Sequence, residues 1–69
     1  MDVKYSDHAE KRIRQRGIAK WEIEHVLEFP FYIKKSFAGR KEAAGKIKGR
    51  ILKIEFVEEE NYIKVITVM

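Results

Sequence analysis

The stretch from Ser6 to Ile18 carries both the start and the stop signals of a helix, and the rest of the chain must pack around it. Ser6 is suited to cap the first turn, because its hydroxyl oxygen can accept a hydrogen bond from a free backbone N–H group. Asp7 and Glu10 place negative charge at the positive end of the helix dipole. Gly17 can adopt the left-handed conformation that ends many helices. The stretch therefore predicts a helix that begins after Ser6 and ends before Gly17.

One flank of this helix gathers an imidazole and two guanidinium groups. At about 100° per residue, His8, Arg12 and Arg16 follow one another at four-residue steps along the border of the apolar face. Two arginines beside a core need either solvent or an anionic partner. The flank therefore has two interpretations, as the ordinary charged edge of an amphipathic helix or as a site for an anion. Lys11 and Arg14 fall on the solvent side, where charges need no special explanation.

Residues 19–28 predict a second helix, which Pro30 ends because the residue before a proline is pushed out of the helical region. Ala19 offers no side-chain cap, but Glu22 can reach back to the N–H group of Ala19 and supply half a capping box. Residues 3–5 are expected to be a short extended lead-in under the first helix. Alternation of apolar and polar side chains predicts four strands, at residues 31–36, 41–47, 50–57 and 62–68.

This order of elements predicts an α+β fold in which two N-terminal helices pack on one face of an antiparallel four-stranded sheet. At 69 residues the chain is predicted to form one domain, residues 1–69. The predicted core draws on one face of the sheet and one stripe of each helix: Leu52, Ile54, Phe56, Ile63, Val65, Ala9, Ile13, Ile23, Val26 and Leu27.

Strand pairing is predicted from the turns. A turn at Lys48-Gly49 sets Gly45 opposite Leu52 and Ala43 opposite Ile54. In the last hairpin, the hydrophobic pattern favours Glu55 directly opposite Lys64, an attractive charge pair. The outer face of the sheet is then expected to carry Lys46, Lys53 and Lys64 around Ile51, Ile66 and Val68.

Several classes of site and location are disfavoured by composition. The chain has no cysteine, two distant histidines and no cofactor motif, so neither a metal site nor a cofactor is predicted. No apolar run approaches the roughly 18 residues that cross a bilayer, and residues 1–5 lack a signal-peptide core. We therefore expect a cytoplasmic protein without a membrane partner.

Positive charge is concentrated in residues 34–53, which hold eight Lys and Arg residues against one acidic residue, Glu42. We call this segment the basic region. A basic surface favours phosphate-bearing or acidic partners, whereas solvated lysines that keep a small protein soluble are the commoner explanation of any single cluster.

The chain resembles a known family, the domain of unknown function 4258 family. The resemblance lies in a first-helix motif, a second-helix motif followed by proline, and the final strand: His8-Ala9-x-x-Arg12-x-x-x-Arg16-Gly17-Ile18, Glu22-Ile23-x-x-Val26-Leu27 with Pro30, and Val65-Ile66-Thr67-Val68. It implies the small RelE/ParE-like toxin fold and an RNA-targeting toxin. Any antitoxin partner is expected to be acidic and to dock over the basic region, because the positive charge there needs a counterpart. One departure is Ala19, where members of the family usually carry Ser or Thr.

With that resemblance, the chemistry that the sequence favours is metal-free RNA cleavage on free or ribosome-bound RNA. In this hypothesis a neighbouring 2′-hydroxyl attacks the phosphorus while the protein moves the proton and stabilises the developing charge. The candidate catalytic residues are His8, Arg12, Arg16 and Thr67. The candidate RNA-binding residues are Arg50, Lys46, Lys48 and Lys53.

Two alternatives stay open at this point. The same basic groups would serve a non-catalytic module that binds RNA or protein. The chain would otherwise be an oligomerisation domain, such as a homodimer with Trp21 and the outer strand face as contacts. For Thr67 the ordinary explanation is a β-forming residue, and for Arg50 a charge beside a turn.

Overall fold

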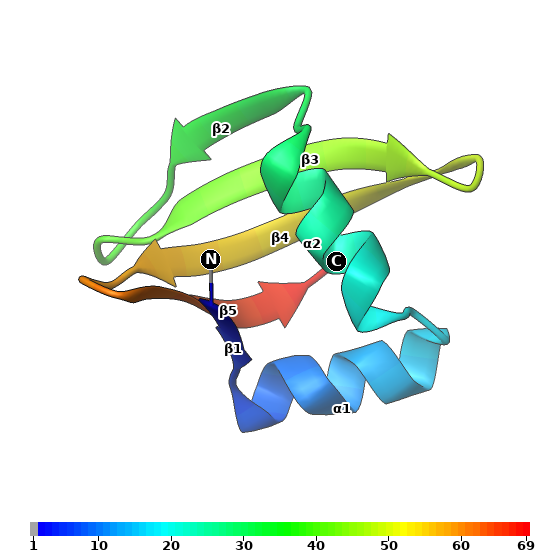
Figure 1. Cartoon of the computed structure of the whole chain (residues 1–69), viewed down its shortest axis with the longest axis horizontal. Helices are drawn as coiled ribbons and strands as arrows, with labels where there is room; N and C mark the ends of the chain where they lie inside the picture. Colours follow the sequence, from blue (N-terminus) through cyan, green and yellow to red (C-terminus); the bar gives the residue numbers. More distant parts are fainter. Residues whose placement is uncertain (1) are drawn as a thin grey trace.

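A computed structural model describes residues 2–69, which form an α+β fold of two helices and one five-stranded mixed sheet (Figure 1). The elements in chain order are β1 (Asp2–Tyr5), α1 (Asp7–Arg16), α2 (Lys20–Glu28), β2 (Tyr32–Lys35), β3 (Lys41–Ile47), β4 (Arg50–Glu58) and β5 (Tyr62–Val68). The strand order across the sheet is β1-β5-β4-β3-β2. Helix α1 packs against β5 and β1, and α2 packs across β3 and β4.

The prediction of four antiparallel strands is wrong because residues 2–5 form a fifth strand. Strand β1 runs parallel to β5, with Val3 beside Ile63 and Tyr5 beside Val65. The other neighbouring strands are antiparallel, as expected. A four-residue strand gives little periodicity to read, and its partner lies about 60 positions along the chain, so local pattern could not reveal the pairing.

The predicted helix ends are confirmed. The hydroxyl oxygen of Ser6 accepts a hydrogen bond from the N–H group of Ala9 at 3.0 Å. Gly17 ends α1 with a left-handed φ of 63°. At the start of α2, Glu22 Oε1 accepts from the N–H group of Ala19 at 2.8 Å, so the half capping box forms despite the missing side-chain cap.

The predicted β3–β4 hairpin is also confirmed, with Ala43 opposite Ile54 and Gly45 opposite Leu52. Gly45 lies directly beneath α2. A Cβ atom at this position would lie 3.0 Å from Val26 Cγ1. The missing side chain thus lets helix and sheet approach closely.

The predicted register of β4 and β5 is wrong. Glu55 pairs with Thr67, and Lys64 pairs with Val57. A bulge between the pairs Phe56–Val65 and Glu55–Thr67 adds one residue to β5. A one-residue insertion turns the following side chains to the other face of the sheet. For this reason Val68, expected on the outer face, is fully buried in the core.

The hydrophobic core lies between the helices and one face of the sheet. All of the predicted core residues are buried except Leu27, which is partly buried against the cluster. Ile18, Ala43 and Val68 also belong to it. Strand β2 carries no such cover, and all four of its residues are exposed. Within residues 2–69, no helix has the length and apolar character needed to cross a membrane.

Candidate functional site

The predicted His8, Arg12 and Arg16 flank lies on α1, directly after the Ser6 cap. His8 and Arg16 are exposed, and Arg12 is partly buried beside the core residues of the helix. The three side chains thus share one flank that solvent reaches. The shared flank follows from the four-residue spacing in a helix, and the predicted helix is confirmed.

Neither arginine of this flank has an anionic partner in the part of the chain that the structure describes. The five ion pairs of residues 2–69 use Lys20, Lys34, Arg40, Lys41 and Arg50. Ten of the fifteen Lys and Arg residues therefore have no carboxylate within 4.0 Å among residues 2–69. The glutamates of α2 do not neutralise the flank, which leaves Arg12 and Arg16 free to bind an external anion.

Arg50, a predicted RNA-binding residue, makes contacts within the protein. Its Nη2 donates to Glu22 Oε1 at 3.4 Å and to the carbonyl oxygen of Gly17 at 3.4 Å. The side chain of Glu22 is buried. The N–H group of Ala19, and to a smaller extent the charges of Lys48 and Arg50, hold the pKa of Glu22 below its ordinary value, although burial acts in the opposite direction. Arg50 thus ties β4 to the junction between the helices.

The other predicted residues lie on the strands of the sheet and in one of its turns. Lys53 belongs to the face of the sheet turned away from the helices, because its neighbours Leu52 and Ile54 are core residues. Thr67 belongs to the same face, because it pairs with Glu55 and precedes the core residue Val68. Lys48 lies in the β3–β4 turn, with its Nζ 5.0 Å from the centre of the Trp21 ring. Lys46, like Lys53, is exposed. The predicted set is therefore distributed over one helix flank, the outer sheet face and one turn.

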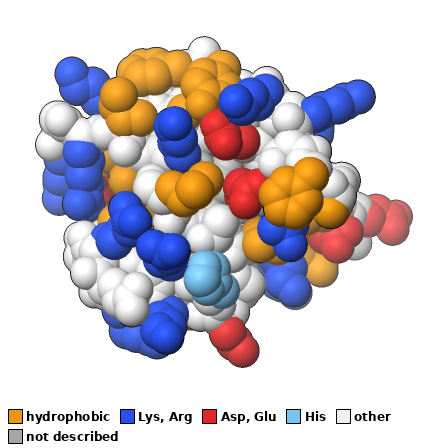
Figure 2. All heavy atoms as spheres, turned by 180° about the vertical axis from the view of Figure 1, so that it is seen from behind, with side chains coloured by type: hydrophobic (Ala, Val, Ile, Leu, Met, Phe, Trp, Pro, Cys, Tyr) orange, Lys and Arg blue, Asp and Glu red, His pale blue; other side chains and the backbone are white. Residues whose placement is uncertain are grey.

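Figure 2 views the molecule from behind, on the side away from α2. Lys and Arg side chains are spread over this side with hydrophobic side chains between them, and a histidine lies beside basic groups. Ile51, which is 59% exposed, belongs to this sheet face. Basic, apolar and some acidic side chains therefore share this face of the molecule.

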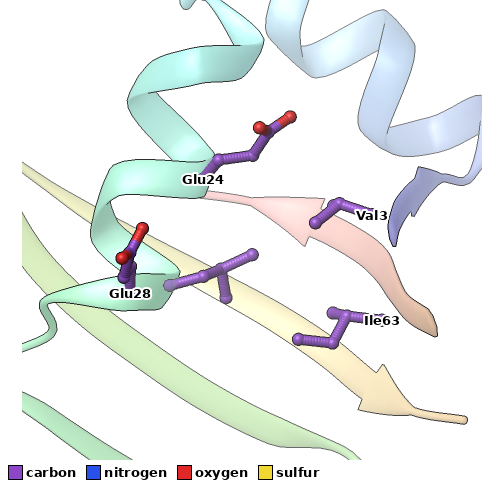
Figure 3. A pocket seen from close by; sticks show the side chains of 5 residues that line it. Val3, Glu24, Glu28 and Ile63 are labelled. Atoms are coloured by element: carbon purple, nitrogen blue, oxygen red, sulfur yellow. The ribbon is translucent and has the colours of Figure 1, made fainter. Parts of the chain in front are cut away.

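A hollow of about 370 Å³ lies on the helix side of the sheet, between α2 and the β1–β5 pair (Figure 3). Val3, Leu27 and Ile63 supply apolar walls, and Glu24 and Glu28 supply carboxylates. A phosphate would meet like charge there. This hollow is therefore not the place where an anion binds.

Sequence reasoning missed a polar cluster on the outer face of the sheet. Glu42 and Glu55 lie directly opposite each other on β3 and β4. Tyr32 donates its hydroxyl proton to Glu42 Oε2 at 2.6 Å, and Ser36 Oγ donates to Glu55 Oε1 at 2.8 Å. The Tyr32 bond lowers the pKa of Glu42 and raises that of Tyr32. The predicted β3–β4 register already set these two carboxylates opposite each other, so this register was a sequence signal for the cluster.

This cluster holds two carboxylates and no histidine or cysteine. No group of three or more His, Cys, Asp or Glu side chains suited to hold a metal ion occurs in residues 2–69. Two groups of the β2–β3 loop are instead held at Glu55: the Ser36 hydroxyl, and Arg40, whose Nη1 lies 3.9 Å from Glu55 Oε2.

Comparison with known proteins gave one match. The family model described as "Domain of unknown function (DUF4258)" matches residues 5–69. No curated protein and no solved structure matches the chain. The match covers α1, α2 and strands β2 to β5, and includes only the last residue of β1, Tyr5.

Proposed function

This chain belongs to the DUF4258 family, and from that premise we propose that it is an RNA-targeting protein whose α1 flank binds RNA phosphates. The proposal includes kinship with RelE/ParE-like toxins. Two helices followed by the antiparallel strands β2 to β5 agree with that kinship.

The observation that carries the proposal is the lack of carboxylate partners for Arg12 and Arg16 within residues 2–69. An arginine beside a core is stabilised by an anion that accepts two parallel hydrogen bonds, and phosphate has the matching geometry. The remaining unpaired cations add a long-range attraction for a polyanion. A phosphate-bearing strand is therefore the partner that the charge distribution favours.

Cleavage is the second part of the proposal. His8 is one helical turn from Arg12 on the same flank, and an imidazole can accept and donate protons near neutral pH. With a bound RNA, His8 would take the proton from the attacking 2′-hydroxyl while Arg12 and Arg16 stabilise the charge on the phosphorus oxygens. The P–O bond to the 5′-oxygen of the next nucleotide would break, and that oxygen would take a proton from water, so that one product carries a 2′,3′-cyclic phosphate and the other a 5′-hydroxyl, while His8 returns its proton to solvent.

The proposed protein partner is an acidic antitoxin that covers the basic region. Within that region, Lys34, Arg40, Lys41 and Arg50 already have carboxylate neighbours. The other four cations, Lys35, Lys46, Lys48 and Lys53, are exposed and have no carboxylate within 4.0 Å among residues 2–69. Association should therefore slow as ionic strength rises, because attraction between charged surfaces is screened by salt. An association rate that ignores salt would contradict this partner.

Binding is tested with a fluorescein-labelled octauridylate and fluorescence anisotropy. The double variant Arg12→Gln/Arg16→Gln should bind at least about tenfold more weakly than the wild type, because two charge-assisted phosphate contacts are lost. The double variant Lys11→Gln/Arg14→Gln removes the same charge from the solvent side of the same helix and is the matched control. Equal losses of affinity in both variants would mean that RNA binding depends only on the total charge of the protein, and would contradict the proposal.

Cleavage is tested with His8→Ala. A variant that binds the octauridylate as tightly as the wild type but no longer cuts a structured RNA would support a catalytic His8. Wild-type protein that binds RNA and never cuts it would leave the non-catalytic module as the function.

A further inference from the structure

The loop between β2 and β3 forms a basic hollow that includes no residue of the α1 flank. A hollow of about 330 Å³ is lined there by Lys35, Ser36, Gly39, Arg40 and Lys41. Three of these five residues are cations, in contrast to the acidic hollow beside α2. The lining therefore favours an anion.

The charges of this hollow are only partly neutralised. Lys35 and Lys41 lie directly opposite each other, an unfavourable placement for two like charges. Lys41 pairs with Glu58, whereas Arg40 is 3.9 Å from Glu55. Lys35 has no carboxylate within 4.0 Å in the described chain. A phosphate between the cations would relieve the repulsion between the two lysines.

An exposed aromatic ring stands beside these cations. Phe37 is 69% exposed, and the guanidinium carbon of Arg40 lies 5.1 Å from its ring centre. Most of the ring is thus open to solvent. Flat nucleobases stack on such rings, and neighbouring cations hold the attached phosphates, which is the usual construction of single-strand binding sites.

The loop is held in this shape by hydrogen bonds. The N–H group of Ser36 donates to the carbonyl oxygen of Arg40 at 2.8 Å, and the N–H group of Arg40 donates to that of Phe37 at 3.1 Å. The hydroxyl of Ser36 donates to Glu55 Oε1 at 2.8 Å. The ring and the cations are therefore presented together before any ligand arrives, which lowers the entropy lost on binding.

We propose that the β2–β3 loop binds one nucleotide unit of single-stranded RNA, with the base stacked on Phe37 and a phosphate held by Lys35 and Arg40. A purely apolar partner would not need the cations, and a free phosphate would not need the ring. The inference rests on the proposed function, because it assigns a second contact on the same RNA.

The test compares two exposed phenylalanines with the labelled octauridylate. Phe37→Ala should weaken binding about fivefold or more, since stacking of one base on an aromatic ring is lost. Phe31, which is 64% exposed and precedes β2, is the matched control, and Phe31→Ala should leave the affinity within about twofold. Thermal unfolding of both variants checks that the loop change has not unfolded the protein.

Charge is tested with Lys35→Gln. This variant should lower the slope of log affinity against log salt by about 0.7, the effect of one phosphate contact on a single strand. Equal affinities for the wild type, Phe37→Ala and Lys35→Gln, together with weak binding by Arg12→Gln/Arg16→Gln, would overturn the loop site and leave the proposed function standing. Failure of the wild type to bind the octauridylate would overturn both. Loss of self-association in Phe37→Ala with unchanged RNA affinity would assign the ring to a protein contact instead.

Discussion

The hydroxyl of Ser6 donates a hydrogen bond to the carbonyl oxygen of Ile66 at 2.7 Å, while its oxygen accepts from the N–H group of Ala9. The N–H group of Ser6 also donates to the carbonyl oxygen of Val65. One residue thus caps α1 and binds the bulged part of β5. A bulge leaves backbone groups without ladder partners, and Ser6 satisfies the carbonyl of the extra residue.

Ser6→Ala should therefore destabilise the protein by about 1–2 kcal/mol, the usual effect of losing a helix cap, with the lost bond to Ile66 adding to it. Ser6→Thr keeps the hydroxyl and should recover most of this difference. Denaturant unfolding of the three proteins measures it. If the alanine variant were as stable as the wild type, the bond to β5 would have no energetic role.

The core prediction can be tested with two isoleucines of β4 that lie three positions apart. Ile54 is 0% exposed and Ile51 is 59% exposed. Ile54→Ala should lower the free energy of unfolding by about 2–5 kcal/mol, a large part of the stability of so small a domain. Ile51→Ala should change it by less than about 0.5 kcal/mol. Similar losses in the two variants would argue against the assignment of faces.

The contrast between these two residues was predictable because the β3–β4 hairpin is fixed by its turn. A two-residue connection determines every pair that follows it, and the hydrophobic alternation agrees. The register of β5 was not predictable in this way. The longer β4–β5 connection permits several registers, and the bulge at Ile66 is stabilised by Ser6, which is distant in sequence.

The candidate site, too, was predictable only where it depends on local structure. The alignment of His8, Arg12 and Arg16 follows from the geometry of one helix and could be predicted. The contact of Arg50 with Glu22 could not, because it joins β4 to α2 through tertiary packing. Residues 37–40 fall between the predicted strands at 31–36 and 41–47. Neither the hollow there nor the approach of the Arg40 guanidinium to the Phe37 ring is encoded in local periodicity.

Glu22 should make stability depend on pH in the acidic range. Its pKa is lowered in the folded protein, so its contribution is complete above the unfolded value of about 4.3 and is lost as the pH falls through the lower folded value. Glu22→Gln removes this titration while keeping an acceptor for the N–H group of Ala19. Thermal unfolding should therefore show a smaller loss of stability in the variant between about pH 5 and pH 3.

Some acid sensitivity should persist in Glu22→Gln, because the pKa of Glu42 is lowered as well, chiefly by its bond from Tyr32. Glu42→Gln should reduce the remaining slope. Parallel pH profiles for the wild type and Glu22→Gln would mean that the ionised carboxylate of Glu22 adds nothing to the fold.

Two arginines on opposite sides of α1 give the sharpest test of the phosphate site. Arg12→Lys keeps the charge and nearly the length of the side chain but replaces the planar guanidinium, which can contact a phosphate through two parallel N–H groups, with an ammonium. If phosphate is bound in that geometry, Arg12→Lys should lose most of the RNA affinity, along with any cleavage and any growth inhibition on expression. Arg14→Lys makes the same chemical change on the solvent side and should be nearly silent. Because both variants conserve charge, a difference between them cannot come from long-range attraction, and equal behaviour would return the flank to an ordinary charged helix edge.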